Sequence, residues 1–396
     1  MKEYNIDINY KEKKVYLLSC TEYTKSLIED LGEEIKIAGI IDILETYRDS
    51  TFYGYNVYKY EDIKESVDGL MIDCSNTTYV EDRLIFDGFK VFENYIDSRY
   101  LRCIVQKKKV MILHGLCDLG HMAKLLRLYP IICENYQIFY FRYDQKNNTR
   151  YSNRILNRLI KICDVYINSR NGGEKFNFSN LELQKNCRII TIPTIRFFGI
   201  WPQINCNYDL YFNKYYIPAL NLLDGAFCPG DIEINKRIDE GIEWEDIYKE
   251  ISDVNFYSKE EVDRVFGKAI RQMEYVEKYN EIKIVDFIKN NYQKEPLFNE
   301  YLHCKNVILF ECIKQISRLL DIELENNMAN KIIPEHVYTE MPVYPSVAHH
   351  LNIEWVNSET KWYIRSYTKP CHVTFKEYVK WYYKYTYAGK QMKENW

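Results

Sequence analysis

Short apolar runs that alternate with helical segments constrain the fold of this chain more than any other feature of its sequence. The runs that read as strands lie at residues 110–113, 137–142, 165–167 and 188–192. Between them, residues 122–128 carry an apolar stripe at helical spacing that ends before Pro130, and residues 155–162 form the next helix. This alternation predicts an α/β fold with a mostly parallel sheet. In such sheets, ligands bind beyond the carboxyl ends of the strands.

The first hundred residues contain a smaller pattern of the same kind. A strand, a helix and a second strand are predicted at residues 15–18, 24–31 and 35–41. The second strand is followed by Asp42, and an acid at this place in a nucleotide-binding βαβ unit can hold a ribose hydroxyl. The glycines that allow a phosphate to approach are missing, because residues 19–21 read Ser-Cys-Thr.

This N-terminal segment resembles the small N-terminal domain of sugar-modifying acyltransferases of the PglD type. The shared pattern is a strand, a helix, "GFID" and then "G..V". It is matched here by Gly39-Ile40-Ile41-Asp42 and by Gly54-Tyr55-Asn56-Val57. The resemblance implies a nucleotide-sugar-binding unit. A docking or folding module without a ligand explains the same residues and stays open.

The chain length predicts more than one domain. A chain of 396 residues exceeds what one hydrophobic core usually organises. The strand and helix pattern is interrupted by a charged, irregular stretch at residues 93–109. We therefore predict a Rossmann-like domain at residues 1–105 and a larger domain at residues 106–396.

Composition and charge exclude several classes of protein. An apolar share of 46% with 28% charged residues is typical of a globular protein. The sequence contains no uninterrupted run of about 18 apolar residues, which is the length needed to span a bilayer. Acidic residues near the N-terminus do not fit a signal peptide, so secretion by that route is not expected. A net charge of −4 offers no general attraction to nucleic acid.

The cysteines indicate a reducing environment. There are twelve, scattered through predicted strands and helices, and no two form a CxxC pair. This distribution fits neither a disulfide framework nor a zinc ribbon. We expect reduced thiols, a cytoplasmic location and no bound metal.

The C-terminal part is predicted to be mainly helical, after a loop-rich stretch at residues 208–241. Ser258 and Glu261 form a capping box for a helix that continues to about residue 279, and residues 307–320 form an amphipathic helix. An aromatic stripe at helical spacing in the tail consists of Tyr378, Trp381, Tyr382 and Tyr385. Such a stripe is more often a docking face than a sugar-binding platform.

The sharpest candidate for chemistry is the turn after the strand at 110–113, which reads His114-Gly115-Leu116-Cys117-Asp118. Gly115 permits a sharp turn, and Cys117 then lies in the first turn of a helix. There, the unpaired N–H groups and the helix dipole favour a thiolate and can stabilise an oxyanion. A cysteine nucleophile also needs a base, for which His121 and His114 are both near enough in sequence.

Two other interpretations of these residues stay open. Free cysteine is among the most buried residue types, so Cys117 could be structural, like the other cysteines. His114, Cys117 and His121 could also hold a metal, although the sequence offers no evident fourth ligand.

The stretch from about residue 110 to 355 resembles the capsular-polysaccharide acetyltransferase family typified by WcbI. Five short motifs occur in the order of the family, "GNCQ", "aDvvI", "iPn.yF.gfHP", "LF.t.nHP" and "yP.va". They are matched at residues 115–118, 164–167, 192–202, 297–303 and 344–348. Leu116 and Asp118 depart from the first motif, in which the glycine and the cysteine match.

The resemblance implies an SGNH-hydrolase-like (flavodoxin-like) three-layer α/β fold with helical C-terminal additions, and coenzyme A or acetyl-CoA as co-substrate. It implies a nucleophilic or acyl-positioning role for Cys117 and a base role for His303. The turn residues expected to line the coenzyme A site are His114, Gly115, Leu116 and Asp118. Trp201 stands where the family has a histidine, and indole cannot accept a proton. Either His303 or His121 then serves as the base, or this member has lost the reaction.

We therefore expect an acyl-CoA-dependent O-acetyltransferase acting on a capsular or cell-surface polysaccharide or its precursor. The alternatives are an esterase or deacetylase with water as acceptor, and a non-catalytic ligand-binding or scaffold protein of glycan assembly. The expected partners are acyl-CoA and a glycan or sugar precursor, without nucleic acid or a membrane span, and a homo-oligomer stays open. Arg170, Arg196 and Lys214 are candidates for binding phosphate. His349 and His350 are expected to face solvent.

Overall fold

The computed structural model describes residues 10, 12–45, 47–75, 78–90, 93–142, 156–157, 159–170, 182–204, 230–324, 339–364 and 371–394. The chain divides into two compact units. The first comprises Met1–Leu116, Pro130–Ile167 and Asn177–Ile189, and the second comprises Cys117–Tyr129, Asn168–Phe176 and Ile190–Trp396. The domain boundary near residue 105 remains a prediction from the sequence.

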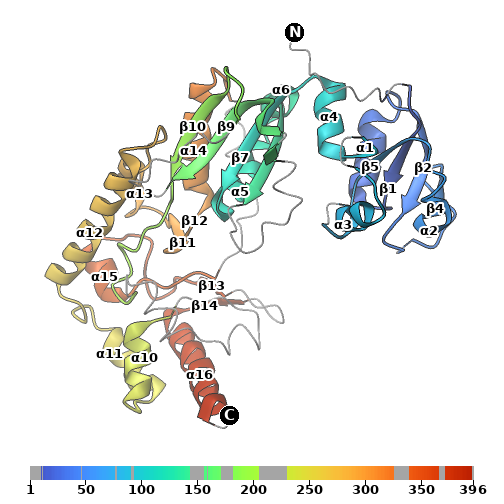
Figure 1. Cartoon of the computed structure of the whole chain (residues 1–396). Helices are drawn as coiled ribbons and strands as arrows, with labels where there is room; N and C mark the ends of the chain where they lie inside the picture. Colours follow the sequence, from blue (N-terminus) through green and yellow to red (C-terminus); the bar gives the residue numbers. More distant parts are fainter. Residues whose placement is uncertain are drawn as a thin grey trace. The chain divides into compact units, whose positions relative to one another are not determined.

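In the described part of the first unit, six strands form a sheet with the order β3-β4-β2-β1-β5-β6 (Figure 1). These strands are β1 (Val15–Leu18), β2 (Ile37–Asp42), β3 (Thr51–Phe52), β4 (Tyr55–Lys59), β5 (Leu70–Asp73) and β6 (Tyr95–Asp97). All neighbouring strands are parallel except β3 and β4. Leu17 of β1 is paired with Ile40 on one side and Ile72 on the other, and all three are fully buried.

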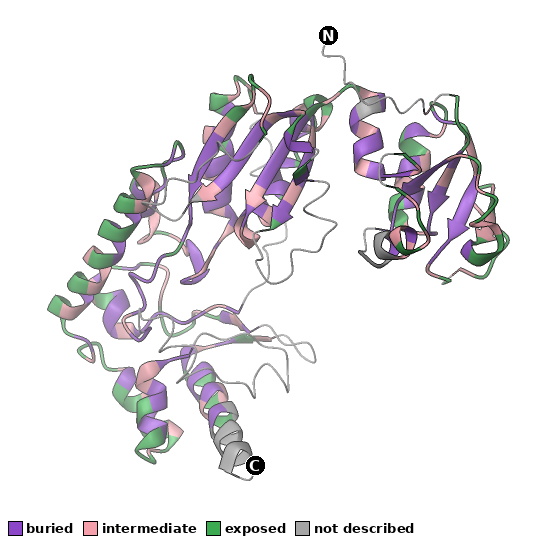
Figure 2. Cartoon of the chain, viewed as in Figure 1, coloured by how far each residue is buried: buried purple, intermediate pink, exposed green. Residues whose placement is uncertain are grey.

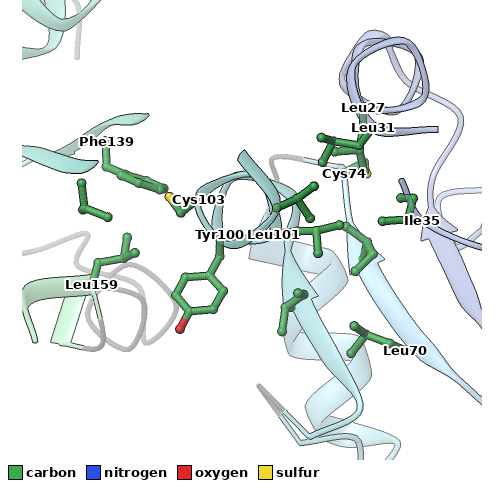
Figure 3. Packing of buried hydrophobic residues seen from close by; sticks show 14 of the residues in the cluster. Leu27, Leu31, Ile35, Leu70, Cys74, Tyr100, Leu101, Cys103, Phe139 and Leu159 are labelled. Atoms are coloured by element: carbon green, nitrogen blue, oxygen red, sulfur yellow. The ribbon is translucent and has the colours of Figure 1, made fainter. Parts of the chain in front are cut away.

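The helices of this part are α1 (Glu22–Leu31), α2 (Tyr60–Ile63), α3 (Thr78–Phe86) and α4 (Ser98–Gln106). Helix α1 begins where Thr21 accepts a hydrogen bond from the backbone of Thr24, whose own side chain caps Thr21 in return. Helix α4 is buried on two sides (Figure 3). Its Leu101 faces Leu27 of α1, while Cys103 lies toward Phe139 in the same hydrophobic cluster.

A second sheet has the strand order β10-β9-β7-β8. Its strands are β7 (Lys109–Gly115), β8 (Tyr136–Arg142), β9 (Cys163–Arg170) and β10 (Arg188–Pro193). Strands β7 and β8 are parallel, and residues 110–113 of β7 are fully buried. Burial on both faces is typical of parallel strands, which explains the continuous apolar run in the sequence. The predicted α/β fold is therefore confirmed. Of the helix expected at 155–162, part lies outside the described residues.

Two helices lie between β7 and β8 in the chain, α5 (Cys117–Leu126) and α6 (Pro130–Asn135). The helices described in the rest of the second unit are α10 (Ile232–Asp239), α11 (Trp244–Ile251), α12 (Lys259–Glu277), α13 (Val285–Asn291), α14 (Asn306–Leu319), α15 (Pro345–His350) and α16 (Phe375–Glu394). Two hairpins complete this part, β11 (Phe298–Glu300) with β12 (His303–Cys304) and β13 (Trp362–Ile364) with β14 (Cys371–Val373). No helix in the described ranges is both long and apolar enough to cross a membrane.

Helix α12 begins as predicted, because the Ser258 side chain accepts a hydrogen bond from the Glu261 N–H at 3.2 Å. Its solvent side is exposed, whereas the strands of both large sheets are mostly buried (Figure 2). The prediction of a loop over 208–241 is wrong for residues 232–239, which form α10. The carboxylate of Asp231 caps this helix by accepting from the Ile234 N–H at 3.0 Å.

The aromatic stripe of the tail is a docking face, as predicted, at the two positions where it is deepest. Tyr378 and Tyr382 of α16 are fully buried. The Tyr382 hydroxyl accepts a hydrogen bond of 2.7 Å from the backbone N–H of Asp231. Helix α16 is thereby attached to the start of α10. The side chain of Tyr385 lies outside the described residues.

Candidate functional site

The predicted strand, turn and helix around Cys117 are present. Strand β7 ends at Gly115, and Cys117 is the first residue of α5 (Figure 1). The cysteine is half-buried. This is the position in a helix at which free N–H groups favour negative charge.

A histidine from a distant part of the sequence reaches this sulfur. Strands β11 and β12 form a tight hairpin in which Glu300 is paired with His303, and Tyr301 and Leu302 make the turn. The Nε2 atom of His303 lies 3.5 Å from the Sγ atom of Cys117. All the residues of this contact belong to the second unit. The structure thus brings together the predicted nucleophile and one of its predicted bases.

Glu300 orients the histidine. Its carboxylate accepts a hydrogen bond from His303 Nδ1 through Oε1, and from the Leu302 N–H at 2.8 Å through Oε2. Its side chain is 1% exposed, and that of His303 is 13% exposed, so both groups are largely shielded from water. Because Nδ1 is occupied by Glu300, Nε2 is the nitrogen that faces the sulfur. Cys117, His303 and Glu300 are therefore connected in series, which is the arrangement that a nucleophile, a base and an orienting acid require.

The electrostatics of this series favour a charged histidine. Burial by itself would lower the pKa of His303. The hydrogen bonds to Cys117 and Glu300, together with the negative charge of Glu300, outweigh burial and raise the pKa to about 10. An imidazolium beside a cysteine sulfur stabilises the thiolate form by direct charge attraction.

Asp118 adds a second carboxyl group to this region. Burial raises its pKa to about 7, and the charge of Glu300 acts in the same direction, against the opposing influence of His303 and Arg196. Arg196 itself is exposed and near enough to act on the start of α5.

His121, the other predicted base, contacts a different residue. It lies one helical turn after Cys117, and its Nε2 atom is 2.6 Å from the Oδ1 atom of Asn306, the first residue of α14. Helices α5 and α14 contact each other. Because α14 begins three residues after His303, this hydrogen bond joins the helix that carries the sulfur to the segment that carries the imidazole.

The remaining residues of the turn lie in the first unit. The Nδ1 atom of His114 is 2.6 Å from the Tyr166 hydroxyl, and burial lowers the pKa of His114 to about 4, so this imidazole is neutral at pH 7. Gly115 is buried, and the Leu116 carbonyl accepts a hydrogen bond of 3.1 Å from the Tyr140 hydroxyl. These contacts hold the turn in place.

Trp201, which stands in place of a family histidine, supports the hairpin. It is 1% exposed, and its Nε1–H donates to the Met341 carbonyl at 3.1 Å. The N–H of Met341 in turn donates to the Asn299 carbonyl at 2.7 Å, next to Glu300. Trp201 therefore packs in the core behind the Glu300–His303 pair.

Other predicted residues are placed as follows. His349 is exposed on α15 as expected, but the expectation for His350 is wrong. That side chain is half-buried, and its Nε2 atom lies 3.0 Å from the Tyr257 carbonyl. Lys214 and the side chain of Arg170 lie outside the described residues. Within the described ranges, no three His, Cys, Asp or Glu side chains are grouped in a way that could hold a metal ion.

Sequence reasoning missed Glu300 and Asn306. The only signal for Glu300 was its position three residues before His303, which places both side chains on the same face of a two-residue hairpin. Asn306 carried no signal of its own, because its role depends on the packing of α5 against α14.

Comparison with known proteins defines the class of this chain. A family model described as the polysaccharide biosynthesis enzyme WcbI matches residues 110–325, which is more than half of the chain. The chain therefore belongs to the WcbI family of polysaccharide biosynthesis enzymes, and the resemblance found in the motifs is confirmed. The match begins at residue 110, so the resemblance of the N-terminal segment to PglD-type domains stays a prediction.

A solved structure of WcbI has a similar fold. It is described as a novel polysaccharide biosynthesis enzyme, in its native form without a disulfide bond between coenzyme A and a cysteine. The TM-score is 0.54 with 14% sequence identity, over 71% of this chain and 90% of the other. At this identity the likeness concerns the fold. No curated protein matches this chain significantly.

Proposed function

We propose that this chain is an acyl-CoA-dependent O-acetyltransferase that acts on a capsular or cell-surface polysaccharide or its precursor. The observation that carries the proposal is the 3.5 Å contact between Cys117 Sγ and His303 Nε2, with His303 bound to the buried Glu300. In a family of polysaccharide biosynthesis enzymes, this arrangement supplies a sulfur nucleophile, a proton carrier and an acid that orients it.

In the first half-reaction, the Cys117 thiolate attacks the carbonyl carbon of the acyl thioester. The bond from carbon to the coenzyme A sulfur breaks, and the departing thiolate takes the proton of the His303 imidazolium. The N–H groups at the start of α5 are suited to stabilise the oxyanion that forms between these two events. The products are an acylated Cys117, free coenzyme A and a neutral His303.

In the second half-reaction, neutral His303 removes the proton from a sugar hydroxyl, whose oxygen attacks the acyl carbon on Cys117. The carbon–sulfur bond breaks and leaves the O-acyl sugar, the Cys117 thiolate and the His303 imidazolium. The Glu300 carboxylate keeps its hydrogen bond to Nδ1 and stabilises the imidazolium in both half-reactions. The side chains thus return to their initial state after each turnover.

Several features of the chain suit coenzyme A as the acyl donor. The WcbI structure is described with reference to coenzyme A and a cysteine, and Cys117 is the half-buried cysteine at the strand-to-helix turn of this chain. Arg196 is exposed and acts on Asp118, so its guanidinium is a reasonable partner for a phosphate. We assign the donor side of the site to the turn residues His114, Gly115, Leu116 and Asp118.

The finer assignments of fold and location follow from the same proposal. The parallel order β4-β2-β1-β5-β6 supports a Rossmann-like N-terminal unit, and the sheet of β7 to β10 with Cys117 at a strand end supports an SGNH-like arrangement. Acyl-CoA is a cytoplasmic metabolite, so the reaction would take place in the cytoplasm.

The test is acetylation of the intact protein by acetyl-CoA, followed by mass spectrometry of the intact chain and its peptides. We expect one acetyl group on Cys117 and an equal amount of free coenzyme A. Cys117→Ala should abolish the acetylation and the release of coenzyme A. Cys371→Ala removes another half-buried cysteine and should leave the acetylation and the release of coenzyme A unchanged.

Three results would change the proposal. If acetyl-CoA remains intact and Cys117 unmodified, the transferase reaction is excluded. If acetyl esters of sugars are hydrolysed in a Cys117-dependent manner without coenzyme A, the chain is an esterase. If neither reaction occurs while a glycan binds, the chain is a non-catalytic binding protein.

A further inference from the structure

A cavity in the second unit shares no lining residue with the site around Cys117. Its volume is about 610 Å³. The lining comes from the end of α11 and the residues after it, from α15 and its flanking segments, from Trp362 of β13, and from the start of α16. Cavities of roughly 300–1,000 Å³ with mainly apolar walls and a few polar groups are typical of sites for small molecules.

The inner wall of this cavity is apolar. Val343, Ala348 and Ile353 are at most 8% exposed and contribute aliphatic surface. Trp362 and Phe375, with ring centroids 6.3 Å apart, are 4% and 8% exposed. Because these two rings are buried, they offer little open surface on which a sugar could stack. The wall therefore favours a hydrocarbon over a polyol.

The rim is polar and carries one lysine. Four of the lining residues are exposed and polar, namely His349, Asn357, Ser358 and Lys376. Of the fifteen described residues that line the cavity, none is Asp or Glu. The Lys376 amine lies 5.7 Å from the ring centroid of Tyr248, which also lines the cavity.

The acid next to Lys376 is engaged elsewhere. The Glu377 carboxylate accepts from the Thr374 N–H at 2.8 Å and from the Thr374 hydroxyl at 3.0 Å, where it caps the start of α16. This carboxylate is thereby held at the start of α16. A second acid, Glu359, accepts a hydrogen bond from the Ser358 hydroxyl of the rim at 3.4 Å.

We propose that this cavity binds one anionic amphiphile, with its hydrocarbon chain against the apolar wall and its carboxylate or phosphate at the rim beside Lys376. Burial of the hydrocarbon chain supplies most of the affinity, because it removes apolar surface from water. The ammonium group supplies the preference for an anion. This site is independent of the chemistry proposed for Cys117.

The experiment is isothermal titration calorimetry on the full chain with four probes below their micelle concentrations. The probes are decyl phosphate, decanoate, 1-decanol and inorganic phosphate. We expect one mole of either amphiphilic anion to bind per mole of protein, decanol to bind roughly tenfold more weakly, and inorganic phosphate not to bind. The ratio of decyl phosphate to decanoate affinity identifies the preferred head group.

Variants separate the two parts of the proposed site. Lys376→Gln should weaken the binding of decyl phosphate and of decanoate roughly tenfold and leave the binding of 1-decanol unchanged. The matched control is Lys380→Gln, since Lys380 is an exposed lysine one turn further along α16 that packs over Trp244 and does not line the cavity. Val254→Trp should block all three amphiphiles, because Val254 lines the cavity and is 47% exposed, so the larger ring fits without entering the core.

The thermal unfolding midpoint of each variant shows whether it is folded. The proposal is overturned if no amphiphile binds the folded wild type. It is also overturned if Val254→Trp, once shown to be folded, binds them as the wild type does, or if Lys376→Gln and Lys380→Gln have the same effect.

Discussion

The Nε2 atom of His121 lies 2.6 Å from the Oδ1 atom of Asn306, and this hydrogen bond connects the two elements that carry the candidate reaction centre. His121 is one turn along α5 from Cys117, and Asn306 opens α14 directly after the strand of His303. The alignment of sulfur and imidazole thus depends on a second contact one helical turn away. His121 is, in our proposal, a positioning residue.

Replacement of His121 by Ala should displace the Cys117 sulfur relative to the His303 imidazole. We expect the rate of Cys117 alkylation by iodoacetamide at pH 7 to fall about tenfold, because a small displacement of reacting groups has a large effect on rate. The midpoint of the pH–rate profile should stay where it is. His121→Gln should restore most of the rate, since its amide N–H can donate to Asn306. The control is His349→Ala, which removes an exposed histidine. A shifted midpoint in His121→Ala would instead identify His121 as the base.

Replacement of Glu300 by Gln should lower the pKa of His303. The carboxylate charge helps to raise that pKa to about 10, and the amide keeps the shape of the side chain without the charge. We expect the NMR titration of the His303 ring to move toward the ordinary value near 6.5, and Cys117 alkylation at pH 7 to slow by about tenfold. An unchanged titration midpoint would show that Glu300 does not control the charge of His303.

The stability of the protein should depend on pH through the charge of His303. The pKa of His303 is about 10 in the folded protein and about 6.5 when unfolded, so the folded state binds the proton more tightly. Its contribution to stability is complete below pH 6.5 and is lost as the pH rises toward 10. The free energies of unfolding of the wild type and of His303→Gln, measured with urea, should therefore differ most near pH 6 and least near pH 10. A difference that stays constant or grows with pH would contradict this.

Tyr382→Phe should destabilise the second unit by about 1–3 kcal/mol, because it leaves the buried N–H of Asp231 without its 2.7 Å partner. The matched variant is Tyr383→Phe, whose hydroxyl makes an exposed contact with Glu243 at 3.2 Å. That change should cost less than about 0.5 kcal/mol. Urea unfolding followed by tryptophan fluorescence measures both. Equal losses of unfolding free energy in the two variants would show that the buried hydrogen bond of Tyr382 does not stabilise the protein more than the exposed one of Tyr383.

Trp201→His should not install a second base. The indole is buried and its N–H donates to the Met341 carbonyl, whereas the imidazole at Cys117 Sγ is that of His303. We expect a loss of about 2–4 kcal/mol in unfolding free energy from the smaller ring, and no gain in the Cys117 alkylation rate. Faster alkylation of Cys117 in the variant would show that a histidine at position 201 can act on the sulfur.

The sequence predicted the parts of the site that depend on local patterns. The apolar run at 110–113 and Gly115 were enough to place Cys117 at the start of a helix. The four strands of the second sheet were predictable for the same reason, because strands buried on both faces are continuously apolar.

The parts that failed depend on contacts between distant segments or on weak local signals. The hairpin turn at Tyr301 and Leu302 has none of the Gly or Asn residues that mark such turns, so the Glu300–His303 pair was not visible. Spacing alone could not choose between His121 and His303, because the choice is made by the packing of α14 on α5. Helix α10 was missed because it is short and rich in charge.

The hairpin that holds Glu300 and His303 also bears on the order of folding. The two residues are three positions apart, whereas Cys117 is 186 positions from His303. Local contacts form early and long-range contacts form late, because a long loop must close first. The acid and the imidazole are therefore expected to meet first, and the sulfur to join them only when α5 docks on α14. A newly made chain would thus bring Cys117 beside its histidine in a late step of folding, because that contact must wait for the longest loop to close.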